Sequence, residues 1–242
     1  MNEIDARDAA NRLIVALDVP TVAEARALVA RLGGAVTFYK VGMWLLYARE
    51  TAAFVDDLIA AGKNVFLDCK MFDIPETVRH GVASVARRGC RIVTVHGDPD
   101  MVAAAAEGAK GTDLMVFAVT VLTSQDDAAL QAMGYDRSVA ELVGKRAHAA
   151  AKAGAAGVIA SASDDLAPLK TLGLKIATPG IRLPGGDAQD QKRIATPGAA
   201  IARGADYLVV GRPITQAPDP VAAAHEVLSR IRQSINQPAA PA

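Results

Sequence analysis

The sequence Asp68-Cys69-Lys70-Met71-Phe72-Asp73-Ile74-Pro75 follows the apolar run Val65-Phe66-Leu67 and precedes a helical pattern. It therefore lies where a strand ends and a loop leads into a helix. Because side chains alternate along a strand, Asp68 and Lys70 are predicted to point to one face and Cys69 to the other. Buried unpaired charges are unfavourable, so charges that face inward together indicate either a structural salt bridge or a reactive site.

Apolar runs of strand type alternate with helical patterns along the chain. The runs occupy residues 13–18, 36–41, 65–67, 91–96, 114–121, 157–160, 174–178 and 207–210. With 242 residues, 51% of them hydrophobic, this alternation predicts a single-domain (β/α)8 barrel. Two small domains or a doubly wound open sheet are the alternatives, but no Gly-x-Gly-x-x-Gly motif follows the first run. The barrel domain is expected to span residues 1–236, with a disordered tail at residues 237–242.

Several residues mark where helices begin and end. Thr21 and Ser138 each precede a Glu by three positions, which is the capping-box pattern. Pro75 suits a first helical turn, and Gly89 ends the helix that follows it. A long helix is predicted over residues 44–61, with Met43 and Trp44 as packing residues.

The composition excludes several classes of function. The 26 basic and 26 acidic residues give no net charge, and no cluster of basic and aromatic side chains indicates a nucleic-acid partner. No apolar run has transmembrane length and the N-terminal segment is charged, so a cytoplasmic protein without membrane contact is expected. The two cysteines, Cys69 and Cys90, are expected to be free thiols.

Polar residues stand at the ends of nearly all the predicted strands, where barrel enzymes place their active sites. They are Asp18, Lys40, Asp68, Lys70, His96, Thr123, Arg182 and Arg212. Several also have a purely structural interpretation: Asp18 can cap a turn, Lys40 can extend to solvent, and Asp73 can cap the helix at Pro75. His96 has no neighbours at metal-ligand spacing and is not assigned a role.

A phosphate site is predicted at the last two strands. Gly211 lets the backbone approach a ligand, Arg212 supplies charge, and Pro213 can begin a short helix. Barrels often bind phosphate after strands seven and eight. The Gly-rich loop at residues 183–191 is expected to close over a substrate, with disorder without function as the alternative.

Taken together, these motifs resemble the orotidine 5'-monophosphate decarboxylase family over almost the whole chain. The resemblance rests on Val15-Ala16-Leu17-Asp18, Lys40-Val41-Gly42, Asp68-x-Lys70-x-x-Asp73-Ile74-Pro75-x-Thr77, Val119-Thr120-Val121-Leu122-Thr123-Ser124, Pro179-Gly180-Ile181-Arg182, Asp190-Gln191-Lys192-Arg193 and Val210-Gly211-Arg212-Pro213-Ile214. One departure is Gly97-Asp98-Pro99-Asp100, where many members have a run of small residues. The resemblance therefore does not predict how the helix that follows this segment packs.

The resemblance implies decarboxylation of orotidine 5'-monophosphate to UMP without a cofactor or metal. Lys70 would donate a proton to the ring carbon that loses carbon dioxide, and Asp68 would orient Lys70 beside the substrate carboxylate. Because this reaction leaves a carbanion without an electron sink, a preorganised positive charge is needed. Flanking carboxylates at Asp68 and Asp73 favour a charged Lys70.

The resemblance also assigns the remaining contacts. Asp18 and Lys40 would contact the ribose, and Thr123 the pyrimidine. Lys40 would also extend the catalytic charge network of Asp68, Lys70 and Asp73. The phosphate would be bound by Arg182, Gln191, Gly211 and Arg212. Asp73 and Thr77 would enter the neighbouring subunit's site, which implies a homodimer.

Two other functions fit parts of the pattern. The Asp-x-Lys-x-x-Asp segment is similar to that of magnesium-dependent barrels acting on sugar phosphates. A barrel that binds phosphate without catalysis is the second alternative.

Overall fold

The computed structural model describes residues 3–184 and 193–236. Within these ranges, parallel strands close into one barrel in which each strand pairs with the next along the chain, and β8 pairs with β1. The strands are β1 (Leu13–Ala16), β2 (Phe38–Gly42), β3 (Asn64–Met71), β4 (Ile92–His96), β5 (Met115–Val119), β6 (Gly157–Ile159), β7 (Lys175–Thr178) and β8 (Tyr207–Val210). The predicted (β/α)8 barrel is confirmed, and the open sheet is wrong.

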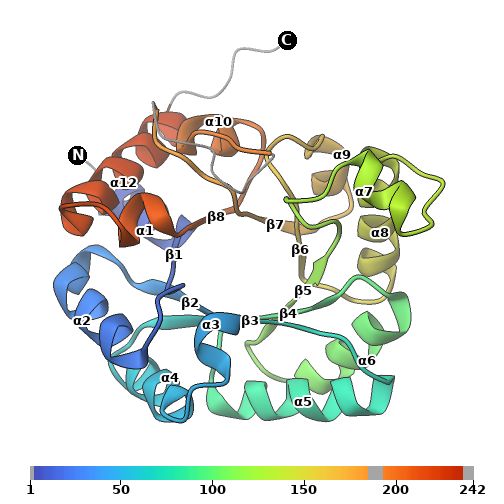
Figure 1. Ribbon diagram of the computed structural model, residues 1–242, viewed down its shortest axis with the longest axis horizontal. Coiled ribbons are helices and arrows are strands. Elements are labelled where there is room, and N and C mark those ends of the chain that lie inside the picture. Colours follow the sequence, from blue (N-terminus) through green and yellow to red (C-terminus); the bar gives the residue numbers. More distant parts are fainter. Residues whose placement is uncertain (1–2, 185–192, 237–242) are drawn as a thin grey trace.

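Helices surround the barrel (Figure 1). They are α1 (Glu3–Arg12), α2 (Val22–Leu32), α3 (Met43–Leu46), α4 (Thr51–Ala60), α5 (Pro75–Arg88), α6 (Pro99–Ala109), α7 (Asp127–Ala132), α8 (Val139–Lys152), α9 (Ala167–Thr171), α10 (Pro197–Ala202), α11 (Arg212–Thr215) and α12 (Pro220–Asn236), with a 3-10 turn at Gly33–Ala35. The tail at residues 237–242 lies outside the described residues.

The core has two layers, as alternation along strands buried on both faces requires. A small inner cluster fills the barrel with aromatic and branched side chains, among them Phe38, Phe66 and Phe117. A larger outer cluster lies between the strands and the helices and includes Val65 on β3. Phe66 and Val65 are neighbours in sequence but belong to different layers, so β3 is regular at its start.

The end of β3 is irregular, whereas the sequence predicted that side chains alternate regularly along it. Leu67 pairs with Val93 and Met71 pairs with Val95, so residues 68–70 stand opposite the single residue Thr94. Lys70 has a φ of 44°, the only positive φ of a non-glycine residue in the described part of the chain. A bulge of this kind redirects a side chain and often lies beside an active site. Simple alternation therefore does not determine where Lys70 points.

The long helix predicted over residues 44–61 is wrong, because the chain breaks between α3 and α4. The Thr51 hydroxyl donates to the carbonyl of Leu45 across this break. The short α3 lies at the barrel rim and leaves Met43 49% and Trp44 62% exposed, so both were wrongly predicted to be packing residues. The spacing of the apolar residues did not predict the turn between α3 and α4, which leads the chain from the rim of the barrel to the outer layer of helices.

The Gly97–Asp100 segment, which departs from the family pattern, forms an ordinary helix start. Asp98 is the N-cap of α6 and accepts a hydrogen bond from the Asp100 N–H at 3.1 Å. A Cβ at Gly97 would lie 2.5 Å from the Val119 carbonyl oxygen, so a glycine is required there.

Helix α1 was not predicted from its charged sequence. None of the described helices combines the length and the apolar character needed to cross a membrane.

Candidate active site

A cavity of about 490 Å³ opens at the carboxyl ends of the strands. The predicted site residues that line it are Asp18, Lys40, Asp68, Lys70, Thr123, Arg182, Gly211 and Arg212. Trp44 also lines the cavity, although it was not predicted as a site residue. Gln191 lies outside the described residues, so its expected phosphate contact remains a prediction.

Four charged side chains form a continuous chain along one wall of this cavity. Lys40 Nζ lies 2.9 Å from Asp18 Oδ1 and 3.4 Å from Asp68 Oδ2. Lys70 Nζ lies 2.8 Å from Asp68 Oδ1. The charges alternate in sign from β1 to β3, so each lysine faces a carboxylate. Gly42 makes room for this pairing, since a Cβ there would lie 2.8 Å from Lys40 Nζ.

The central carboxylate, Asp68, is only 8% exposed. Burial alone raises its pKa, but the charges of Lys40 and Lys70, together with hydrogen bonds from Lys70 and Thr94, outweigh burial and lower the pKa below its usual value. Asp68 is therefore ionised across the neutral range. Two ammonium groups share this one buried anion.

Thr94 is part of the site but was not predicted from the sequence. Its hydroxyl donates to Asp68 Oδ1 at 2.8 Å and accepts from the Lys70 N–H at 2.9 Å. The side chain is fully buried on β4. Threonine is common in strands, so its presence within an apolar strand did not indicate a site residue. The one available signal was its position two residues before His96, on the same face of a strand whose end lies at the rim.

Asp73 and Thr77 lie apart from this charge chain. Both are exposed, and Asp73 accepts a hydrogen bond from the Ile74 N–H at 2.7 Å. Among the described residues, Lys70 pairs with Asp68 and not with Asp73. Asp73 therefore does not flank Lys70 within one chain, and its expected place in the site of a neighbouring subunit stays a prediction.

The residues expected to bind phosphate lie on the other side of the barrel mouth. Arg182 follows β7, is 8% exposed, and donates to the Ile181 carbonyl at 2.9 Å. Gly211 separates β8 from α11. Among the described residues, the atom nearest to a Cβ at Gly211 would be Ala16 Cβ, at 3.7 Å. The glycine therefore keeps cavity space open and does not relieve a clash within the protein.

Arg193 holds the chain on the carboxyl side of residues 185–192. Its guanidinium pairs with buried Asp164 and donates to the Leu122 carbonyl at 3.2 Å. Burial raises the pKa of Asp164, with Arg193 and the Ser161 N–H opposing this effect. Arg193 is thereby joined to the loops that follow β5 and β6.

His96 lies beside the site without lining the cavity. Burial, aided by the charge of Arg146 and opposed by Asp98, lowers its pKa. Its ring packs edge-on against Phe72, with 4.8 Å between the ring centroids.

The described residues contain no group of three or more His, Cys, Asp or Glu side chains arranged to hold a metal ion.

Comparison with known proteins identifies the family. The sequence profile of the orotidine 5'-phosphate decarboxylase / HUMPS family matches residues 11–227. The chain belongs to this family.

Individual relatives agree with this assignment. An orotidine 5'-phosphate decarboxylase of a Bradyrhizobium species is 50% identical over 235 residues, which cover 96% of this chain and 95% of that protein. One from Afipia carboxidovorans is 51% identical over 223 residues, covering 91% of this chain and 94% of the relative. The crystal structure of orotidine 5'-phosphate decarboxylase from Lactobacillus acidophilus superimposes with a TM-score of 0.79 at 34% identity, covering 91% of this chain and 99% of the other.

The lowered pKa of Asp68 predicts how the charge chain contributes to stability. A carboxylate whose native pKa lies below its unfolded value stabilises the fold fully above the unfolded pKa. This contribution is lost as the pH falls through the lower native pKa. We expect Asp68→Asn to reduce the free energy of unfolding by about 2–3 kcal/mol at neutral pH, less than for most fully buried ion pairs, because Lys70 is partly exposed.

The stabilities of the two proteins should approach each other as the pH falls below the unfolded pKa of an aspartate, about 3.9, towards the lower native pKa of Asp68. Urea unfolding of both proteins at a series of pH values from about 7 to 3 measures this difference. A difference that stays constant over the series would contradict the assignment of Asp68 as the ionised centre.

Proposed function

We propose that this protein decarboxylates orotidine 5'-monophosphate to UMP and carbon dioxide, with Lys70 as the proton donor. The observation that carries this proposal is the position of Lys70. Its ammonium is 2.8 Å from a buried carboxylate, and it lines a cavity that also contains Arg182 and Arg212. The membership in the decarboxylase family supports the choice of substrate.

The chemistry of the reaction matches what this lysine offers. Breaking the bond between the pyrimidine ring and its carboxylate leaves the electron pair on the ring carbon as carbon dioxide departs. No conjugated group accepts that pair, so a fixed positive charge next to the carbon must stabilise it. Lys70 supplies the charge and then its proton, which forms the new C–H bond of UMP. The neutral amine regains a proton from solvent before the next turnover.

Asp68 has two roles in this mechanism. It fixes the Lys70 ammonium through Oδ1 and contacts Lys40 through Oδ2. It also lies next to the departing carboxylate, so that the two negative charges repel each other until carbon dioxide leaves. Its pairing with both lysines keeps Asp68 ionised and keeps a positive charge at the ring carbon.

The remaining cavity residues position the substrate. Asp18 and Lys40 contact the ribose hydroxyls, and Thr123 contacts the pyrimidine. Arg182, Gly211 and Arg212 bind the phosphate, and Gln191 completes that contact from the loop. Phosphate binding is remote from the reacting carbon, and it accelerates the reaction only because its energy is used to hold the ring against Lys70.

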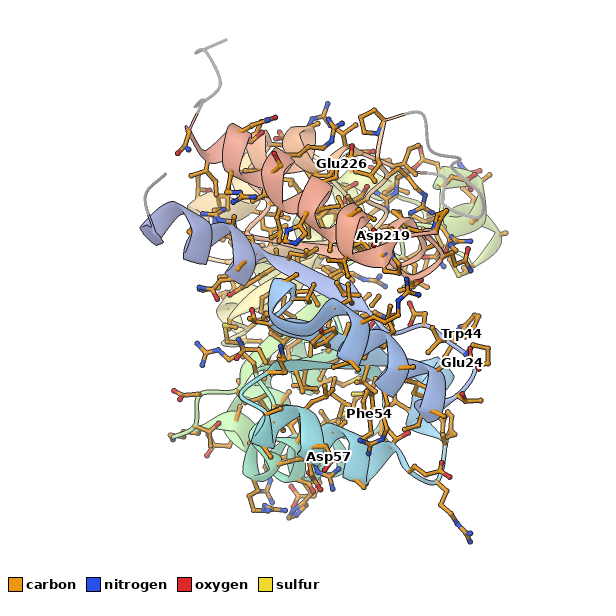
Figure 2. All side chains as sticks on the ribbon, turned by 90° about the vertical axis from the view of Figure 1, so that its left-hand side faces the viewer. Glu24, Trp44, Phe54, Asp57, Asp219 and Glu226 are labelled. Atoms are coloured by element: carbon orange, nitrogen blue, oxygen red, sulfur yellow. The ribbon has the colours of Figure 1, made fainter. Side chains whose placement is uncertain are left out.

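The active protein is a homodimer in which Asp73 and Thr77 complete the partner's site. Large apolar side chains are exposed on the segments that follow β2 and β3: Tyr47 is 84% exposed, and Phe72 and Ile74, the neighbours of Asp73 in sequence, are each 67% exposed. Trp44 projects at the right-hand edge of Figure 2, on α3, which packs beside β3. An exposed apolar surface of this kind is typical of a protein interface. The exposed Asp73 lies between Phe72 and Ile74, so an interface formed by these side chains also covers it.

The assay that tests the function follows the loss of orotidine absorbance and the appearance of UMP. We expect the purified protein to convert orotidine 5'-monophosphate at the same rate with and without EDTA, because lysine supplies the positive charge. Activity that requires added magnesium would favour a metal-dependent sugar-phosphate enzyme. Binding of UMP without any turnover would favour a non-catalytic phosphate-binding barrel.

Mixed dimers test the contribution of Asp73 across the interface. Lys70→Ala and Asp73→Ala are each expected to be nearly inactive alone. When the two are refolded together in equal amounts, about half of the dimers are mixed, and each mixed dimer contains one intact site. Activity should then return to about a quarter of the wild-type value.

The recovery depends on which subunit uses Asp73. If Asp73 served its own subunit, every site of the mixed dimer would lack either Lys70 or Asp73, and no activity would return. Mixing Lys70→Ala with Asp68→Ala is the matched control. Those two residues share one site, so this mixture should stay inactive.

A further inference from the structure

We infer that Thr94 is a positioning residue for the reaction, and that its hydroxyl fixes both members of the Asp68–Lys70 pair. The inference rests on the proposed decarboxylation and extends it to a residue that does not line the cavity. Because Thr94 does not line the cavity, it is not expected to contact the substrate. It acts on the backbone of Lys70 and on the carboxylate of Asp68.

The geometry at the bulge supports this role. Thr94 is the one residue of β4 opposite residues 68–70, between the pairs Leu67–Val93 and Met71–Val95. In a regular ladder, the N–H of a strand residue donates to a backbone carbonyl of the neighbouring strand. Here the Lys70 N–H donates instead to Thr94 Oγ1 at 2.9 Å. The threonine hydroxyl therefore replaces the acceptor that the bulge removes.

The backbone of Lys70 needs such a partner. Its φ of 44° lies in the left-handed region, which a residue with a Cβ adopts only when its surroundings impose it. The hydrogen bond from the Lys70 N–H to a fully buried side chain provides that constraint. Without the hydroxyl, this N–H loses its acceptor, and Lys70 is free to leave the left-handed region.

The same hydroxyl orients the carboxylate. Thr94 donates to Asp68 Oδ1 at 2.8 Å, and Lys70 Nζ donates to the same oxygen at 2.8 Å. The three groups form a closed ring: Thr94 holds the Lys70 backbone, Lys70 Nζ binds Asp68, and Asp68 accepts from Thr94. Removing one hydroxyl opens the ring at two points. The distance from the Lys70 ammonium to the reacting carbon is then no longer fixed.

Thr94→Val tests the inference, because valine keeps the shape of threonine and lacks the hydroxyl. We expect kcat for orotidine 5'-monophosphate to fall by about 10–100-fold, the effect of a small misplacement of a reacting group. UMP binding, measured by calorimetry, should change by less than about threefold, because the ribose and phosphate contacts remain. Thr94→Ser restores the hydroxyl and should recover kcat to within about threefold of wild type.

A matched control separates positioning from loss of a buried hydrogen bond. Thr120 is also buried, and its hydroxyl donates to the Ile159 carbonyl at 2.7 Å, away from Asp68 and Lys70. Thr120→Val should keep wild-type kcat. If Thr94→Val does not fold by circular dichroism, Thr94→Ala gives the same comparison with less steric demand.

Three results would overturn the inference. They are near-normal kcat in Thr94→Val, failure of Thr94→Ser to recover kcat, and loss of UMP binding in parallel with kcat. In each case, kcat or the affinity for UMP is compared with that of the wild-type protein. Absence of turnover in the wild type would instead reject the proposed decarboxylation itself, so the two failures are distinguishable.

Discussion

The Asp68 carboxylate, shared between Lys40 and Lys70, is the interaction on which the rest of the site depends. A buried anion with two cations around it stays ionised, and it holds both ammonium groups inside the barrel mouth. Without it, Lys70 would lose its carboxylate partner, and Lys40 would keep only Asp18. Lys40 lies on β2, and Asp68 and Lys70 lie on β3, so the parallel pairing of these two strands brings the charges together.

The barrel architecture was predictable because each of its units carries its own local signals. The capping box at Ser138 and Glu141 forms as expected, and Gly89 ends α5 in the left-handed conformation. The residues at the strand ends, such as Asp18 and Arg182, converge because parallel strands end at the same rim. The family resemblance then added roles that residue spacing alone left open.

What the sequence did not reveal depends on departures from regular local structure. The bulge opposite Thr94 has no signature in residue type, since a lysine gives no sign of a left-handed backbone and a threonine is common in strands. The break between α3 and α4 lies within a run that has helical apolar spacing. In both places long-range packing at the rim overrides the local preference.

The most direct test of Lys70 as the proton donor is the decarboxylation rate of Lys70→Ala at saturating substrate. The comparison is Lys110→Ala, which removes an exposed lysine on the surface. We expect Lys70→Ala to lose turnover by more than about 10³-fold, because the charge facing the developing carbanion is removed. The Lys70→Ala protein should still fold and bind UMP, and Lys110→Ala should match the wild type. Near-normal turnover by a folded Lys70→Ala protein would contradict the role of Lys70 as the proton donor.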